Sequence, residues 1–151
     1  TAGMLPQIKK FINEKKKYKL AISLNASTNL VRNKIMPINK KWSIEELINA
    51  GKKYSRLKNR QVMFEYVLLK GINDSLNDAY RLSNLLKGIF CKLNVIPYNE
   101  TGGEFQRTER EKIEAFTKVL YENRDKCRIL IRWSKGQDIA AGCGQLATQK
   151  S

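Results

Sequence analysis

The chain has 151 residues, of which 42% are hydrophobic and 28% are charged, as expected for one globular domain that can bury a core. Its 29 lysines and arginines against 14 aspartates and glutamates give a net charge of +15, which indicates a polyanionic partner, with a solvated basic surface or an anionic membrane surface as the alternatives. No apolar run is long enough to span a bilayer, and no segment has the pattern of a signal peptide. The chain has three widely spaced cysteines and no histidine, which excludes a zinc site and favours a reducing cytoplasm.

The first predicted element is a helix over residues 4–17. Its apolar side chains recur at helical spacing, and Pro6 suits the first turn, where no amide donor is needed. Six lysines lie between positions 9 and 19 against the single Glu14. They form either a phosphate-facing edge or a plain exposed helix face.

A short apolar strand is expected over residues 20–24, and it ends in polar residues that include Ser23 and Asn25. Polar groups at the carboxyl end of a strand are what a parallel barrel uses to hold ligands, although a simple exit into a loop gives the same pattern. Residues 27–34 read as a short helical turn that ends before Pro37.

The next helix begins at Ser43, where Glu46 three residues later completes a capping box, and its C-terminal half is strongly basic. Residues 61–69 then form a nearly continuous apolar strand, typical of one buried on both faces. Glu65 interrupts this strand, and a carboxylate there must be paired or face a polar interior. We expect a structural pairing role for Glu65 rather than a catalytic one.

The second half repeats the alternation of helices and strands. A turn over residues 71–74 precedes a helix that stops near Gly88, and a strand over 92–98 leads into a polar loop over 100–106. Thr108 and Glu111 predict a second capping box, and residues 127–133 a last strand. Such alternation predicts an α/β fold with right-handed crossovers, and about four parallel strands are too few to close a barrel, so an open half-barrel is expected.

Near the end of the chain, Cys143 stands between Gly142 and Gly144. Flanking glycines let the backbone turn tightly and leave room for a large ligand beside the sulfur. From this pattern alone, Cys143 is either a small buried filler or a presented nucleophile.

Several segments match one family in its own order: residues 21–26 (AISLNA), 37–39 (PIN), 65–69 (EYVLL), 71–74 (GIND), 94–99 (NVIPYN) and 137–146 (QDIAAGCGQL). Together they resemble the RlmN/Cfr family of radical S-adenosylmethionine (SAM) RNA methyltransferases, and the resemblance covers essentially the whole chain. It implies a partial (β/α) barrel with mostly parallel strands and flanking helices, which holds SAM and a 4Fe–4S cluster at the carboxyl ends of its strands.

Carried over position by position, Ser23, Leu24 and Asn25 match the SAM-contacting Ser-Leu-His or Ser-Leu-Asn of the family, and Asn99 matches a second SAM-contacting asparagine. Cys143 matches the cysteine that is methylated and then bonded to the substrate carbon, whereas Cys91 and Cys127 read as core thiols. No metal ligand is assigned. The family's CxxxCxxC cluster motif is absent, so residues 1–151 are expected to be the C-terminal part of a methyltransferase domain that is inactive without its cluster-binding half.

The resemblance further implies methylation of carbon 2 of adenine in 23S ribosomal RNA, with tRNA as a second candidate substrate. An electron donor to the cluster, a cytoplasmic location and a monomeric full-length protein follow from it. Methylation of carbon 8, as in Cfr-type enzymes, is one alternative. A non-catalytic basic RNA-binding α/β module is the other, and composition without the family match favours only that module.

Overall fold

The computed structural model of the chain describes residues 1–133. Helices and strands alternate along them, as the sequence predicts. The elements in chain order are α1 (Leu5–Asn13), β1 (Ala21–Ser23), α2 (Asn29–Ile35), the 3-10 helix η1 (Pro37–Lys40), α3 (Ile44–Lys58), β2 (Val62–Leu68), α4 (Leu76–Leu86), β3 (Cys91–Pro97), α5 (Arg110–Asn123) and β4 (Cys127–Ile131).

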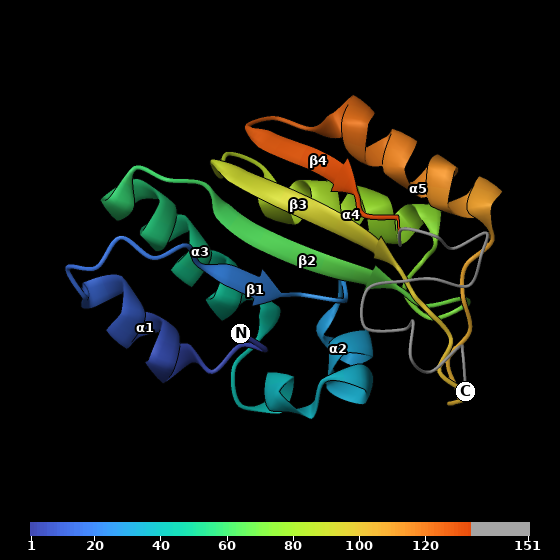
Figure 1. The fold of residues 1–151 in the computed structure, drawn as a ribbon, viewed down its shortest axis with the longest axis horizontal. Helices are drawn as coiled ribbons and strands as arrows, with labels where there is room; N and C mark the ends of the chain where they lie inside the picture. The colour runs from blue at the N-terminus through green and yellow to red at the C-terminus, as the bar shows by residue number, and fades with distance from the viewer. Residues whose placement is uncertain (134–151) are drawn as a thin grey trace.

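The four strands form one sheet in the order β1-β2-β3-β4, and every pairing is parallel (Figure 1). The chain between successive strands therefore returns to the same end of the sheet through a helical crossover after β1, β2 and β3. Strands β1 and β4 lie at opposite edges, so the sheet stays open within the described residues. This arrangement confirms the expected α/β fold with a partial barrel. No helix of residues 1–133 is long and apolar enough to cross a membrane.

The helix starts show where local sequence signals hold and where they fail. Ser43 and Glu46 form the predicted capping box of α3, and Ser75 with Asp78 forms an unforeseen one at α4. The box predicted for Thr108 is wrong. Helix α5 begins one residue later, with Glu109 at its N-cap, because the Thr108 hydroxyl donates instead to the Asp74 carboxylate at 2.7 Å. A buried tertiary partner thus replaces the local cap.

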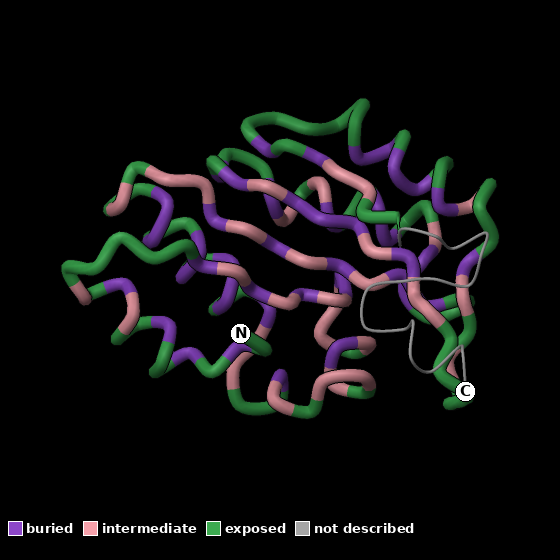
Figure 2. The backbone as a smooth tube through the Cα atoms, viewed as in Figure 1, coloured by how far each residue is buried: buried purple, intermediate pink, exposed green. Residues whose placement is uncertain are grey.

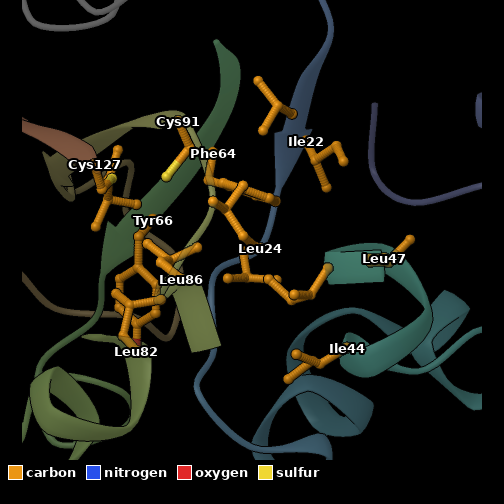
Figure 3. Close-up of a cluster of buried hydrophobic side chains, with 14 of the residues drawn as sticks. Ile22, Leu24, Ile44, Leu47, Phe64, Tyr66, Leu82, Leu86, Cys91 and Cys127 are labelled. Carbon is orange, nitrogen blue, oxygen red and sulfur yellow. The ribbon is translucent and has the colours of Figure 1, made fainter. Parts of the chain in front are cut away.

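The hydrophobic core lies between one face of the sheet and helices α3, α4 and α5 (Figures 1 and 2). Figure 3 shows Phe64 and Tyr66 of β2 pointing into this core. The centroid of the Tyr66 ring lies 5.5 Å from the centroid of the Phe116 ring in α5. Along β2, buried residues alternate with half-buried ones. The expectation that this strand is buried on both faces is therefore wrong for the described residues, since the helices cover only one face.

A fully buried arginine holds the segment that follows β1. The Arg32 side chain comes from α2 and is 0% exposed. Its guanidinium donates to the carbonyls of Ala2, Ser23 and Leu24, each at 2.8 Å, and to the Asn39 amide oxygen at 3.2 Å. Burial lowers the pKa of this guanidinium to about 10, so it stays charged at neutral pH. Four oxygen acceptors, rather than a carboxylate, compensate its charge.

We expect Arg32→Lys to lower the free energy of unfolding by about 2–4 kcal/mol. A lysine ammonium cannot reproduce the planar fork of donors, and each buried acceptor left unpaired costs about 1–3 kcal/mol. Urea unfolding measures the change. Arg56→Lys on the exposed face of α3 is the matched control and should change stability by less than about 0.5 kcal/mol. An equal decrease in the free energy of unfolding in the two variants would show that the four hydrogen bonds of Arg32 contribute little to stability.

Candidate functional site

The carboxyl ends of β1, β2 and β3 meet at one edge of the sheet, where the loops to α2, α4 and α5 begin (Figure 1). In an α/β sheet this edge is the usual place for ligands. Residues 23–25 lie at and just beyond the end of β1 and Asn99 follows β3, so β2 lies between them. Neighbouring strands lie about 4.8 Å apart, and Asn99 also lies farther along the strand direction than residues 23–25, because Ser23 is in register with Asn94.

The three residues predicted at the end of β1 differ in what they present. Leu24 is fully buried and its side chain points into the core (Figure 3), while its backbone groups bond to Glu65 and Arg32. Only Ser23 and Asn25 therefore offer side chains on the ligand side. Asn25 has a left-handed φ of 58°, and its amide oxygen accepts a hydrogen bond from the backbone of Val67 at 2.9 Å. This side chain extends the pairing of β2 beyond the end of β1.

A buried asparagine in the next loop fixes this turn. Asn73 is 0% exposed, and its amide nitrogen donates to the carbonyls of Asn25 at 2.7 Å and Val67 at 2.8 Å. Its amide oxygen accepts from the backbone of Leu69 at 2.7 Å, and its own carbonyl accepts from the Tyr66 hydroxyl. The sequence predicts only a turn here, but in the structure Asn73 locks the ends of β1 and β2 together.

Asp74 joins the same loop to α5. This 2% exposed carboxylate accepts from the Thr108 hydroxyl at 2.7 Å and pairs with the Lys112 ammonium at 3.0 Å. Farther along the β3–α5 connection, the Arg107 guanidinium donates to the Asn99 amide oxygen at 3.2 Å. Asn99 is therefore held at the edge of the sheet by a residue that the sequence did not single out.

The face of the sheet that the described helices leave uncovered carries polar side chains in register. Ser23 of β1, Glu65 of β2 and Asn94 of β3 are Cα partners across the strands, and Leu130 of β4 completes the row. We call these four residues the middle row. The expected pairing of Glu65 is not found, because none of the ion pairs within residues 1–133 includes it. Glu65 is half-buried and lies on the face of the sheet that the described helices leave uncovered.

The two cysteines of the described region belong to the core, as predicted. Cys91 is 0% and Cys127 is 6% exposed, and they are Cα partners on neighbouring strands (Figure 3). A hydrogen bond with Cys127, together with burial, raises the pKa of the Cys91 thiol. A thiol that resists ionisation is a poor nucleophile and a poor metal ligand. Residues 1–133 also contain no cluster of three side chains suited to a metal ion.

A basic surface lies on the C-terminal half of α3, away from the carboxyl edge. Lys52, Lys53 and Arg56 are exposed and line a shallow depression together with Asn49 and Leu57. None of these three cations takes part in an ion pair within the described range. The depression therefore presents unneutralised positive charge, whereas two lysines of α5, Lys112 and Lys118, pair with Asp74 and Glu122.

Cys143, the predicted methyl-accepting residue, lies outside the described residues. Ser23, Asn25 and Asn99 are brought to one edge of the sheet, and Leu24 contributes backbone alone. Arg32, Asn73 and Asn94 were missed as site residues, because buried polar side chains have no periodic or spacing signal in a single sequence.

Comparison with known proteins supports the resemblance, although no family model matches the chain. The chain is 47% identical over 99% of its length to the dual-specificity RNA methyltransferase RlmN 2 of Myxococcus xanthus, and 44% identical over 97% to the RlmN of Paracoccus denitrificans. It covers 39% and 37% of these two relatives.

A solved structure of a related protein is similar to the chain in both sequence and fold. The crystal structure of a radical SAM methyltransferase from Sphaerobacter thermophilus matches 98% of this chain with a TM-score of 0.87 and 39% sequence identity, and the match spans 43% of that protein. The chain thus spans about two fifths of the length of the proteins it matches, and over that segment it is similar to RNA methyltransferases named RlmN and to a solved radical SAM methyltransferase.

Proposed function

We propose that the chain is the C-terminal part of a radical SAM enzyme that methylates carbon 2 of adenine in 23S ribosomal RNA and in tRNA. One observation carries the proposal: a relative named as a dual-specificity RNA methyltransferase is 47% identical over almost the whole chain. The polar carboxyl edge of the sheet supports it, because it offers a ligand site where this fold class places one. The relatives in the comparison carry the RlmN name, which favours carbon 2 over the carbon 8 chemistry of Cfr-type enzymes.

The described residues fit SAM as a ligand. The Asn94 amide oxygen is buried without a hydrogen-bond partner, which indicates that the uncovered face is built to receive a polar group. Ser23, Asn25 and Asn99 would hold SAM at the carboxyl edge, while Arg32 and Asn73 keep the turn after β1 in place. A bound 4Fe–4S cluster would supply the electron for the reductive cleavage of SAM, and we place its ligands in the N-terminal half of the protein.

Cys143 is the proposed methyl carrier. Carbon 2 of adenine is electron-poor, so it does not attack a SAM methyl group directly, and a cysteine thiolate that first accepts the methyl group provides a route. Cys91 and Cys127 cannot take this role from their places in the core. The partner cysteine that releases the product by disulfide formation is also expected in the N-terminal half.

We expect Cys143→Ala in the full-length protein to abolish formation of 2-methyladenosine in ribosomal RNA while leaving the fold intact. Cys127→Ala is the matched control and should retain methylation, because this thiol is part of the core. Mass spectrometry of nucleosides from cells that carry each variant in place of the wild-type gene measures both. Methylation by the Cys143→Ala protein would remove the assigned role, and 8-methyladenosine as the wild-type product would favour the Cfr-type alternative. If cells with the wild-type gene contain neither 2-methyladenosine nor 8-methyladenosine, the non-catalytic RNA-binding module would be favoured.

We further propose that RNA phosphates contact the depression formed by Lys52, Lys53 and Arg56. Folded RNA presents phosphates that release counterions when lysine and arginine neutralise them, and these cations are free to do so. The other partner is an electron donor for the cluster, and we expect a cytoplasmic, monomeric protein.

Reversing two of these charges, Lys52→Glu with Arg56→Glu, should weaken RNA binding by the full-length protein about tenfold or more at moderate salt. The dependence of log K on log salt should also become shallower by roughly one unit per lost phosphate contact. Filter binding across a salt series measures both quantities. Lys118→Glu with Arg124→Glu makes the same change of net charge at exposed positions at the C-terminal end of α5 and should change affinity far less. Equal losses in the two pairs would mean that net charge, rather than this depression, attracts RNA.

A further inference from the structure

The middle row contains hydrogen-bonding groups that the protein itself does not satisfy. Asn94 is 1% exposed, and its amide nitrogen has only the weak sulfur acceptor of Met63, at 3.2 Å. Its amide oxygen is buried with no hydrogen-bond partner. An acceptor left unpaired in a protein interior costs about 1–3 kcal/mol, and such groups are rare in folded proteins. The position therefore calls for a donor from a ligand.

Glu65 stands beside Asn94 in the register and shows the same need. No hydrogen bond or ion pair of its carboxylate is found within residues 1–133. The cations Lys92 and Arg128 belong to the next row toward the amino ends of the strands, in register with Met63. Two residues along a strand correspond to about 6.6 Å, so this row lies below the middle one.

The two neighbouring side chains thus present oxygen acceptors for which the described residues provide no hydrogen-bond donor. An ionised carboxylate only accepts hydrogen bonds, and the free group of Asn94 is an oxygen. Beside Asn94 and toward the carboxyl edge, the uncovered face is apolar, with Leu130 in the same row and Val67 and Ile96 as the next register pair. Apolar walls with a few fixed polar groups are typical of sites for small ligands and cofactors.

A nucleoside fits this chemistry. Its flat base suits apolar walls, and its ribose presents two adjacent hydroxyl donors, which acidic side chains commonly bind in α/β sheets. The middle row lies just below the edge where Asn25 and Asn99 are held. A nucleoside that enters from this edge with its ribose inward would place the hydroxyls near Glu65 and Asn94.

We propose that the Glu65 carboxylate and the Asn94 amide oxygen accept hydrogen bonds from the ribose hydroxyls of the nucleoside ligand. This inference rests on the proposed function, under which that ligand is SAM. The two residues are additional binding residues of the site, beyond those that the family resemblance assigns. A ribose inside an RNA chain has only its 2′-hydroxyl free, whereas SAM has both, and this difference separates the two sources of the same chemistry.

Equilibrium dialysis of labelled SAM against the full-length protein, with its cluster reconstituted, tests the inference. We expect Glu65→Gln, which keeps the volume and removes the charge, and Asn94→Leu, which removes the amide, each to weaken SAM binding about tenfold. Glu111→Gln and Asn84→Leu make the same changes at exposed positions of α5 and α4 and should leave the affinity unchanged. RNA affinity should be the same in all five proteins.

A comparison of ligands identifies the groups that are bound. Adenosine should displace SAM from the wild-type protein more effectively than 3′-deoxyadenosine does, and this preference should shrink in Glu65→Gln. If Asn94→Leu lowers the midpoint of thermal unfolding so far that the protein is not folded under the assay conditions, the test rests on the Glu65→Gln variant alone.

The outcomes separate the inference from the proposed function. Wild-type protein that binds no SAM would overturn the proposed function and the inference with it. Wild-type protein that binds SAM, with Glu65→Gln and Asn94→Leu binding equally well, would overturn the inference alone, and water would then be the partner of Asn94. If Glu65→Gln and Asn94→Leu lose RNA affinity but keep their SAM affinity, the inference is also overturned, because the middle row would then bind the ribose of the RNA.

Discussion

The site depends on a buried guanidinium at the point where the chain leaves β1. Arg32 binds three carbonyl oxygens and one amide oxygen, and it ties the first residues of the chain, the end of β1 and η1 to a single planar group. Burying a charge costs free energy unless polar partners surround it, so this part of the chain has one well-satisfied arrangement. Asn73 then fastens the adjacent turn to β2. The polar edge of the sheet is therefore held in place by contacts within the protein itself.

Much of the fold follows from the sequence, because periodicity and capping are local properties. The alternation of helices and strands, the parallel sheet and the start of α3 are all confirmed. Predictions failed where a distant residue competed with a local signal. Thr108 binds Asp74 rather than capping α5, and β2 is buried on one face only, because burial depends on which helices pack against the sheet.

The site was less predictable than the fold. Family resemblance located Ser23, Asn25 and Asn99 at one edge, but a sequence cannot show that Leu24 points into the core or that Asn94 lacks a partner. Glu65 illustrates the limit: a carboxylate within an apolar strand must be paired or face a polar space, and only the sheet register decides between these. The register places it on the uncovered face, beside Asn94.

The most direct test of the central claim is whether a methyl group passes through Cys143. Full-length protein with its cluster reconstituted would be incubated with methyl-labelled SAM under reducing, anaerobic conditions in the absence of RNA, digested, and its cysteine peptides sequenced by mass spectrometry. We expect the label on the Cys143 sulfur and none on Cys91 or Cys127. Label on a core cysteine, or an unmodified Cys143 in protein that then methylates RNA, would contradict the claim that this residue carries the methyl group.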